Sequence, residues 1–413
     1  MTRVLRLTPH FYHPSLKEKG WPIAFDAIGG MQTQLFRQTL ELGRQGIEQT
    51  VVTLRVPGVP ATYSPGTLVN VRGVRVPILP IRSRIRGMVD LNASWFLGGL
   101  LETLIGDKRW DIIHVHGSGV FWPLLLGQIL SRRRKIPLIV TVHCSILATY
   151  HAMSLFDRWL QPFAQAVERN TIRYASRTIT LTNRVADFYI STLGVPESRV
   201  EVVPDCIDAH TFESLASEAA SIRFRQRFQL PSNQKIIAFV GRIAHEKGWP
   251  HLLTLAQNLR DLPVHFLVCG DGNEGDDFRQ RVRDLNLGSR FTITGFIPIE
   301  EVPSAMRCSD VLVLPSLHEE FGSVLLEAMA VRLPIVAFAV GGVPHVMPEG
   351  LGGLLVAPND VESMADRVRR VLDDKLLACE IAEKGFRRVC ERFDLSESCS
   401  HLRRMYSQVV GTK

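Results

Sequence analysis

The chain has 413 residues, of which 46% are hydrophobic and 22% are charged, and its formal net charge is +7. This composition is typical of a soluble globular protein, and the length exceeds one ordinary hydrophobic core, so we expect two domains. No apolar run is long enough to span a bilayer, which excludes a membrane-spanning protein.

Short β-rich runs alternate with helical stretches along the chain. In the first half we predict strands at residues 4–7, 50–54, 112–116, 138–143, 178–181 and 200–203. In the second half we predict them at residues 236–240, 264–269, 291–294, 311–314, 335–338 and 354–356. Several of these runs are continuously apolar, which is typical of parallel strands buried on both faces. The predicted fold class is therefore α/β, with a doubly wound parallel sheet that occurs twice.

The boundary between the two predicted lobes lies where the strand pattern lapses, between Pro204 and Lys235. We assign residues 1–208 to an N-terminal Rossmann-like lobe and residues 209–394 to a C-terminal one. Residues 395–413 contain an amphipathic helix, which we expect to cross back and pack on the N-terminal lobe. Ligands of such sheets bind beyond the carboxyl ends of the strands, so we expect an interlobe cleft to hold the site.

The segment Ser316–Glu327 carries the most informative pattern, because it joins an apolar strand to a short helical run. Gly322 in the turn and Ser323 as a candidate N-cap would leave backbone N–H groups for a phosphate at the helix start. Glu319 and Glu327 offer carboxylates to hydroxyl groups. Amides for a diphosphate beside carboxylates for hydroxyls indicate a nucleotide-sugar site.

A second loop, Gly241–Gly248, follows the first strand of the C-terminal lobe. Gly241 lets the backbone approach a ligand, and Arg242 and Lys247 place two cations at the carboxyl end of that strand. Together these cations could neutralise a diphosphate leaving group, which other enzymes do with a metal ion. For either residue alone a solvated loop is the simpler interpretation, but beside the two carboxylates the pair forms a coherent site.

Three further features of the N-terminal lobe are candidates. The adjacent glycines Gly29 and Gly30 precede a predicted helix and suit an anion, although a plain tight turn explains them nearly as well. His143 ends an apolar strand on the expected cleft side, where a histidine can meet a substrate. His114 and His116 alternate along their strand, so His116 could also reach the cleft while His114 packs.

The segment Gly270–Gly275 formally matches the dinucleotide fingerprint and follows a strand. Asp271 and Glu274, however, put negative charge where a pyrophosphate would lie, and no acidic residue closes a second strand about twenty positions later. We interpret this segment as a tight turn, which leaves a nicotinamide oxidoreductase as the weakest alternative. The sequence shows no metal-ligand cluster, nucleophile elbow or Walker loop, so we expect no metal site.

Cysteine usage and charge bear on location and partners. Seven cysteines are scattered without a Cys-x-x-Cys pair, and residues 1–8 lack an apolar signal core, so we expect a cytoplasmic protein. Residues 1–210 contain 24 Lys and Arg against 15 Asp and Glu, a net charge of +9, which leaves −2 for the rest. This basic half is either a solvated face or a surface for an acidic partner such as an anionic bilayer. The arginine runs lack interleaved aromatic residues, which argues against nucleic acid.

Taken together, these motifs resemble glycosyltransferase family 4, the retaining enzymes of the GT-B fold, over nearly the whole chain. The positions that match the family's motifs are Gly29 and Gly30, His143, Gly241 with Arg242 and Lys247, and Glu319 with Glu327. Residues 340–344 and 352–356 are similar to the family's closing segments.

The resemblance implies a role for each matched residue of the C-terminal lobe. Arg242 and Lys247 would hold the donor diphosphate, together with the backbone amides of Phe321, Gly322 and Ser323. The carboxylate of Glu319 would contact hydroxyls of the donor sugar, and the carboxylate of Glu327 would contact the ribose. The resemblance also implies front-face displacement with retention, in which the leaving diphosphate deprotonates the acceptor and neither a cofactor nor a metal is required.

The N-terminal lobe resembles a narrower group, the N-acetylglucosaminyltransferases that act on 2-deoxystreptamine in aminoglycoside antibiotic biosynthesis. The similar segments are residues 29–32, 82–92, 141–145, 150–154 and 203–205. His143 would then position the transferred sugar, and Tyr150 lies in one of the similar segments. A cationic aminocyclitol needs local carboxylates in a basic lobe, for which Asp26, Asp157 and Glu18 are the candidates.

The leading hypothesis is transfer of N-acetylglucosamine from UDP-N-acetylglucosamine to a hydroxyl of an aminocyclitol such as 2-deoxystreptamine, forming an α-glycoside. The alternative keeps the enzyme class but makes the acceptor a lipid-linked or polysaccharide sugar at the membrane surface. A catalytically silent nucleotide-sugar-binding protein is a third interpretation. The expected partners are a small-molecule donor and acceptor, and the sequence leaves the oligomeric state open.

Overall fold

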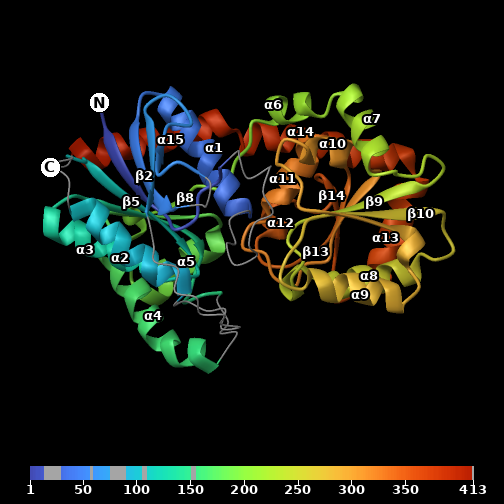
Figure 1. Cartoon of the computed structure of the whole chain (residues 1–413), viewed down its shortest axis with the longest axis horizontal. Helices are drawn as coiled ribbons and strands as arrows, with labels where there is room; N and C mark the ends of the chain where they lie inside the picture. Colours follow the sequence, from blue (N-terminus) through green and yellow to red (C-terminus); the bar gives the residue numbers. More distant parts are fainter. Residues whose placement is uncertain (14–28, 56–58, 75–89, 105–108, 150–154, 412–413) are drawn as a thin grey trace. The chain divides into compact units, whose positions relative to one another are not determined.

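The computed structural model describes residues 1–13, 29–55, 59–74, 90–104, 109–149 and 155–411, without the side chains of residues 90–91 and 155–157 (Figure 1). The described residues form two compact units. Unit 1 consists of residues 1–13, 31–204 and 395–411, and unit 2 consists of residues 29–30 and 205–394. The chain passes from unit 1 to unit 2 between Pro204 and Asp205 and returns to unit 1 at Leu395.

Unit 1 is built on an eight-stranded sheet in the order β3-β4-β2-β1-β5-β6-β7-β8. Its strands are β1 (Arg3–Leu7), β2 (Glu48–Leu54), β3 (Thr62–Tyr63), β4 (Val69–Val74), β5 (Ile112–Ser118), β6 (Leu138–Cys144), β7 (Arg177–Thr180) and β8 (Val200–Val202). All neighbours are parallel except β3 and β4. In β1, Leu5 lies opposite Thr50 of β2 on one side and Ile113 of β5 on the other, so the strand order reverses between β1 and β5.

Helices cover both faces of this sheet (Figure 1). One face carries α1 (Gly30–Arg44) and α15 (Leu395–Gly411), and the other carries α2 (Asp90–Leu104), α3 (Trp122–Arg134), α4 (Leu155–Tyr174) and α5 (Asn183–Leu193). Alternate strand residues divide between two cores, as the strand period of two requires. Leu5 packs in a cluster with Trp95 of α2 and Leu126 of α3, whereas Val51 packs with Leu35 of α1.

The C-terminal helix packs on unit 1, as the sequence predicted. The buried residues of α15 form one stripe, Leu395, Cys399, Leu402, Met405, Tyr406 and Val409. On its polar side, Nε2 of His401 lies 2.7 Å from Oε2 of Glu201, which belongs to β8. The last helix of the chain therefore belongs to the first sheet.

Unit 2 is built on a six-stranded parallel sheet in the order β11-β10-β9-β12-β13-β14. Its strands are β9 (Lys235–Val240), β10 (Val264–Cys269), β11 (Phe291–Gly295), β12 (Val311–Leu314), β13 (Ile335–Phe338) and β14 (Gly353–Val356). One face carries α8 (Trp249–Asn258), α9 (Gly275–Asp284) and α13 (Val361–Asp373). The other carries α6 (Ala209–Leu215), α7 (Glu218–Arg227), α10 (Val302–Arg307), α11 (Ser323–Ala330) and α14 (Lys375–Arg392), while the short α12 (Val343–Val346) follows β13. Numbered from β9, this is the Rossmann order 3-2-1-4-5-6.

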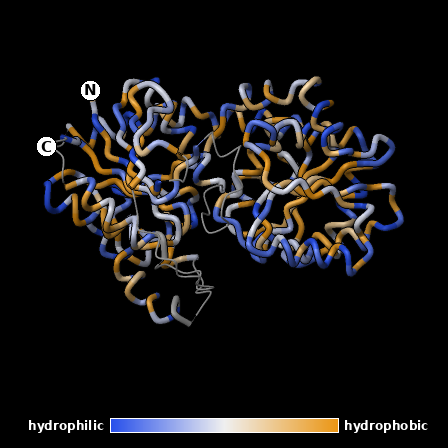
Figure 2. The backbone as a smooth tube through the Cα atoms, in the orientation of Figure 1, coloured by the Kyte–Doolittle hydropathy of each residue, from blue (hydrophilic) through white to orange (hydrophobic). Residues whose placement is uncertain are grey.

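Both sheets confirm the predicted α/β class and its buried parallel strands. Figure 2 shows the hydrophobic colour concentrated along the strands of each sheet and the polar colour along the outer helix faces and loops. All twelve predicted strands are present, each with ends within two residues of the prediction. The prediction missed β3 and β4, because β4 has the sequence Val-Asn-Val-Arg-Gly-Val and its polar positions hide a strand that is only partly buried.

Within the described ranges, no helix combines the length and the apolar character that crossing a membrane requires.

Candidate functional site

The strand order of unit 2 reverses between β9 and β12, and two loops that carry predicted site residues leave the sheet at this point. β9 and β12 are adjacent and parallel, with Ala238 opposite Leu312. The β9 loop, residues 241–248, follows one strand, and the β12 loop, residues 315–322, follows the other. Ligands of open parallel sheets bind beyond the carboxyl ends of the strands at such a reversal, so this edge is the candidate site of unit 2.

Backbone contacts hold the two loops together. The N–H groups of Leu317 and His318 donate to the carbonyl oxygen of Glu246, at N···O distances of 2.9 and 3.3 Å. Gly248 has a φ of +74°, and a Cβ there would lie 1.8 Å from the carbonyl oxygen of Pro315. Only glycine meets both conditions, the left-handed backbone and the close approach.

An ion pair between Lys247 and Glu319 joins the side chains of the same loops. Nζ of Lys247 lies 2.7 Å from Oε1 of Glu319, and that oxygen also accepts a 2.9 Å hydrogen bond from Oγ of Ser316. Glu319 is only 6% exposed, whereas the side chain of Lys247 is 25% exposed. Because an ammonium has three N–H donors and this one reaches solvent, Lys247 can bind a ligand anion while it holds Glu319.

Arg242 lies in the β9 loop with its guanidinium near a second carboxylate. Its Nη2 is 2.8 Å from Oε1 of Glu246, and both side chains are more than a third exposed. An exposed pair of this kind contributes little to stability. Loss of this pair on binding of an anion would therefore cost little.

The start of α11 differs in one respect from the prediction. The N-cap residue is Gly322, with a φ of +86°, and Ser323 is the first residue of the helix. Ser323 was predicted to be the cap, but its Oγ donates instead to Oδ2 of Asp205, 2.7 Å away. Asp205 is buried and far away in sequence, so a local capping preference could not anticipate it. The helix start has no side-chain cap, so its backbone N–H groups can donate to an anion, with the Asp205 carboxylate held against Ser323 beside them.

Phe321 and Glu327 flank this helix start. Phe321 is buried, and its ring contacts that of Phe393 edge to face with centroids 5.9 Å apart. This contact fixes the turn that precedes α11. Glu327 lies four residues into α11 and is half-buried. The structure thus brings the predicted amide and carboxylate groups to one edge of unit 2.

Two glycines outside these loops fix the position of Glu319. Gly341 has a φ of +50°, and a Cβ there would lie 1.8 Å from the carbonyl oxygen of Glu319. The N–H of Gly342 donates to that carbonyl oxygen at 2.9 Å, and a Cβ on Gly342 would lie 2.2 Å from the carbonyl oxygen of Glu320. The turn after β13 therefore presses directly on the backbone that carries the candidate carboxylate.

The segment Gly270–Gly275 packs against the β9 loop as a turn. A Cβ on Gly270 would lie 1.9 Å from the carbonyl oxygen of Gly241, and the carboxylate of Asp271 pairs with Arg279 at 2.7 Å. Oε2 of Glu274 accepts a 2.6 Å hydrogen bond from the indole of Trp249. These contacts give the acidic residues structural partners and agree with the interpretation of a tight turn.

In unit 1, His143 ends β6 and lies in a cluster of buried histidines. Its Nε2 is 3.2 Å from Nδ1 of His116, and its Nδ1 is buried without a hydrogen-bond partner among the described residues. Burial first, and then the nearby Arg6 cation, lower the pKa of His143 to about 3, so the imidazole is neutral at physiological pH. His116 and His114 are also fully buried, with ring centroids 4.4 Å apart.

The prediction that His114 packs while His116 reaches a cleft is therefore wrong. Residues two apart on a strand point to the same face, and the structure buries both rings together. His143 is the member of the cluster at the carboxyl end of its strand, where the prediction placed it.

Sequence reasoning missed Glu168 of α4, which shapes the loop after His143. Its buried carboxylate accepts hydrogen bonds from Oγ of Ser145 and the N–H of Ile146, both at 2.6 Å, and from the hydroxyl of Tyr189 at 2.7 Å. Burial raises the pKa of Glu168, and these donors oppose that rise. A lone glutamate in the middle of an amphipathic helix gives no sign of this role in the sequence.

The remaining predicted residues of the N-terminal lobe are only partly within the described chain. Gly29 and Gly30 directly precede and begin α1, as the helix prediction required. Asp26, Glu18 and Tyr150 lie outside the described residues, and Asp157 lies in α4 with its side chain outside them.

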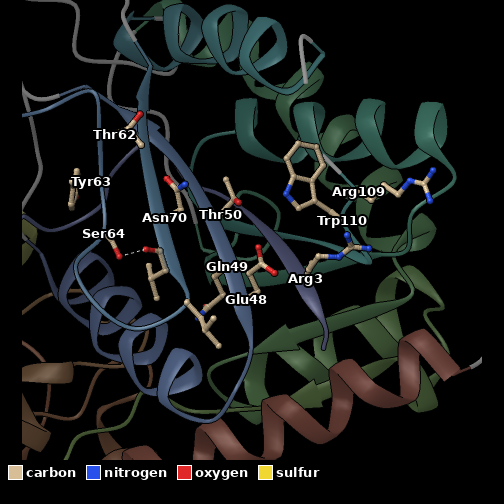
Figure 3. Close-up of a pocket in the computed structure, with 12 residues that line it drawn as sticks. Arg3, Glu48, Gln49, Thr50, Thr62, Tyr63, Ser64, Asn70, Arg109 and Trp110 are labelled. Atoms are coloured by element: carbon tan, nitrogen blue, oxygen red, sulfur yellow. Dashed lines mark hydrogen bonds between the residues drawn. The ribbon is translucent and has the colours of Figure 1, made fainter. Parts of the chain in front are cut away.

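A pocket of about 500 Å³ lies elsewhere on unit 1 (Figure 3). Its lining includes Arg3, Glu48 and Val69, which begin β1, β2 and β4, together with Trp110, which precedes β5. The pocket therefore opens at the amino ends of the strands, on the edge opposite His143, and we do not assign the candidate chemistry to it.

Among the residues that the structure describes, no group of three or more His, Cys, Asp or Glu side chains is arranged to hold a metal ion.

Two family models match the chain over adjacent ranges. The model described as Glycosyltransferase Family 4 matches residues 28–211, and the model described as Glycosyl transferases group 1 matches residues 221–388. The first match covers most of unit 1, and the second lies within unit 2.

Two curated relatives cover most of the chain. The 2-deoxystreptamine glucosyltransferase of Streptomyces kanamyceticus is 38% identical over 386 residues, which are 92% of this chain and 99% of that protein. The 2-deoxystreptamine N-acetyl-D-glucosaminyltransferase of Streptomyces fradiae is 38% identical over 368 residues, 88% of this chain and 86% of that protein. Among solved structures, sucrose-phosphate synthase from Thermosynechococcus elongatus matches all of both chains with a TM-score of 0.82 at 20% identity, which shows a shared GT-B fold.

The glycine contact with Glu319 gives a stability prediction. We expect Gly341→Ala to lower the free energy of unfolding by about 2 kcal/mol or more, because the new Cβ strains a left-handed backbone and collides with a carbonyl oxygen. Urea unfolding followed by circular dichroism measures this loss. Gly288→Ala is the matched control, since nothing lies within 4 Å of a Cβ at that position. Equal stability of the two variants would contradict the contact.

The neutral histidine cluster gives a pH prediction. The folded pKa of His143, about 3, lies below its unfolded value of about 6.5, so the stability that its neutral form contributes is complete above pH 6.5 and is lost as the pH falls toward 3. We expect the thermal unfolding temperature to fall between pH 7 and pH 5, and to fall less in His143→Gln. The exposed His210→Gln is the control and should follow the unmodified protein; a parallel loss in all three would show that other groups cause the acid sensitivity.

Proposed function

The chain belongs to glycosyltransferase family 4, and we propose that it transfers N-acetylglucosamine from UDP-N-acetylglucosamine to a hydroxyl of an aminocyclitol such as 2-deoxystreptamine. The acceptor is supported by the two curated relatives, whose names give the same aminocyclitol. The observation that carries the donor half of the proposal is the Lys247–Glu319 pair beside an uncapped helix start, at the point where the strand order reverses.

The donor diphosphate is assigned to the cations and amides of unit 2. Lys247 and Arg242 supply positive charge, and the N–H groups at Gly322 and Ser323 supply hydrogen bonds at the positive end of the α11 dipole. As the glycosidic bond breaks, negative charge grows on the leaving diphosphate, and fixed donors of this kind stabilise that charge most.

The carboxylates are assigned to hydroxyl groups of the donor. Oε1 of Glu319 accepts from Lys247 and Ser316, which leaves Oε2 to accept from hydroxyls of the sugar. Glu327, one turn into α11, is assigned to the ribose. His143 of unit 1 is assigned to the transferred sugar, which it would meet as a neutral ring.

The proposed transfer retains the configuration of the anomeric carbon. The bond from that carbon to the diphosphate breaks, the acceptor oxygen forms its bond on the same face, and the acceptor proton passes to the leaving phosphate oxygen. In this scheme the leaving group is the base, so the protein supplies position and charge. The carboxylate of Glu319 is held by Lys247 in a hydrogen-bonded pair and is therefore poorly suited to act as a base or a nucleophile.

A direct assay tests the donor and the acceptor together. We expect the purified protein with UDP-N-acetylglucosamine and 2-deoxystreptamine to form one pseudodisaccharide, detected by mass spectrometry, with an α-anomeric proton coupling in its NMR spectrum. UDP-glucose is the essential second donor, because the two relatives carry names with different sugars at equal identity. A β-linked product would contradict retention, and absence of any product from a folded protein would contradict the assignment of the acceptor.

The basic first half of the chain favours one alternative acceptor, a lipid-linked sugar at an anionic membrane. Product with a lipid-linked acceptor alone, together with vesicle binding that salt reverses, would support it over the aminocyclitol.

A variant pair tests the role of the buried carboxylate. We expect Glu319→Gln to lower kcat by about 100-fold or more, because it removes the charge that orients Lys247 while keeping the size of the side chain. Lys247→Ala should show a loss of the same order. The control is Lys235→Ala, which breaks another 2.7 Å lysine–carboxylate pair, with Asp310, at the amino end of β9. Full activity in Glu319→Gln, or equal losses in Lys235→Ala, would contradict the site.

A further inference from the structure

Arg6 on β1 is a fully buried cation in the centre of the unit 1 sheet. Its Nη1 donates to Oγ1 of Thr39 on α1 at 3.1 Å, and its Nη2 donates to the hydroxyl of Tyr406 on α15 at 3.2 Å. In the part of the chain that the structure describes, no carboxylate forms a salt bridge with it. Buried charges are normally paired, so an unpaired buried cation requires an explanation.

A continuous set of contacts leads from this cation to His143. The hydroxyl of Tyr406 lies 2.7 Å from Nδ1 of His114, and Nε2 of His114 lies 2.8 Å from Oγ1 of Thr141. The ring of His114 lies against that of His116, and Nδ1 of His116 is 3.2 Å from Nε2 of His143. Tyr406 belongs to the last helix of the chain, so that helix is connected through His114 and His116 to His143, which is proposed to touch the substrate.

The donors and acceptors of the first part can be assigned from their chemistry. A guanidinium only donates, so the oxygen of Tyr406 accepts from Arg6 and its single proton is free for Nδ1 of His114. His114 then carries its own proton on Nε2 and donates it to Thr141. This arrangement satisfies the hydroxyl and both nitrogens of a neutral His114.

The contact between His116 and His143 has only two neutral forms. If Nε2 of His143 carries the proton and donates, Nδ1 of His116 is bare and His116 carries its proton on Nε2. If Nδ1 of His116 carries the proton and donates, Nε2 of His143 is bare and His143 carries its proton on Nδ1. Both rings are therefore protonated on Nε2, or both on Nδ1.

The nitrogens at the two ends of this pair have no partner among the residues that the structure describes. Nδ1 of His143 and Nε2 of His116 are buried and have no hydrogen-bond partner in the described structure. Burial is the main cause that lowers the pKa of each ring. Arg6 lowers the pKa of His143 further, and His114, Arg6 and His143 lower that of His116, so neither ring accepts a second proton near neutral pH.

We propose that His116 is a positioning residue that sets, through its single shared hydrogen bond, which nitrogen of His143 is protonated, and that Arg6, His114 and Tyr406 hold this pair in place from β1 and α15. The proposal rests on the proposed function, in which the free nitrogen of His143 meets the transferred sugar. His143 would then present a donor or an acceptor according to the state of its neighbour.

Spectroscopy on the ligand-free protein tests the proposal without any assay of activity. In protein labelled with ¹⁵N-histidine, long-range ¹H–¹⁵N spectra distinguish the two neutral tautomers of each ring. We expect His116 and His143 to be neutral and to share the same tautomer, and His114 to be protonated on Nε2. Tyr406→Phe should shift the His114 signals, while Tyr174→Phe, which removes a hydroxyl from the unit 1 surface, should leave all three rings unchanged. Unlike tautomers in His116 and His143, or a charged ring, would overturn the proposal.

Kinetics of the transfer reaction test whether His116 positions His143 or only fills space in the core. We expect His116→Leu to lower kcat by about 3- to 10-fold, the effect of one lost hydrogen bond, with little change in the KM for the donor. His116→Asn keeps a polar group near the position of Nδ1 and should recover most of that loss. Equal losses in both variants with unchanged His143 spectra would show a structural role only. If the unmodified protein transfers no sugar, the proposed function fails, and the spectra still decide whether the pair is coupled.

Discussion

The ion pair between Lys247 and Glu319 sets the geometry of the carboxyl edge of unit 2. A carboxylate that is 6% exposed is stable there only with a fixed partner, which Lys247 supplies. Two glycines make the pairing possible, since Gly248 presses on the carbonyl of Pro315 and Gly341 on the carbonyl of Glu319. The side chains meet at 2.7 Å because the backbones on both sides are already in contact. In the proposed function, the ammonium is thereby in position before a donor binds, which is the condition for strong stabilisation of a leaving group.

The groups around His143 in unit 1 are mostly uncharged. Its candidate histidine lies among neutral rings, and the buried cation of Arg6 acts on it by lowering its pKa. Glu168 is the buried carboxylate of this region, and it is occupied by the hydroxyls and amides that shape the loop after β6. Under the proposed function, the charged groups of unit 2 serve the diphosphate, and the uncharged donors and acceptors of unit 1 serve sugar hydroxyls.

The parts of this structure that the sequence predicted are those encoded locally. The apolar runs identified twelve strands because each is buried on both faces, and β4 escaped because Asn70 and Arg72 interrupt its pattern. Loop residues such as Lys247 were found because charged groups directly after buried strands are conspicuous. The missed features depend on contacts between distant residues. Ser323 does not cap its helix, because its hydroxyl donates a hydrogen bond to Asp205, 118 positions earlier. Arg6 and Tyr406, 400 positions apart, meet only because the last helix packs on the first sheet.

The two possible donor sugars differ in size, so a site built for one would reject the other to a different degree than the reverse. N-acetylglucosamine differs from glucose by an acetamido group in place of a hydroxyl, and the two relatives show that one family accommodates both sugars. A site shaped for the acetamido group also admits glucose. The glucose donor then lacks only the contacts of the acetamido group, and where those contacts are apolar the difference in kcat/KM between the two donors is small. A site closed around a hydroxyl rejects the acetamido group by steric overlap. In the proposed site, the close backbone contacts at Gly341 and Gly248 would restrict the movement of Glu319 and Lys247. Slow use of UDP-glucose beside fast use of UDP-N-acetylglucosamine would therefore indicate a pocket built for the acetamido group, whereas complete rejection of the larger donor would indicate a glucose enzyme on the same scaffold.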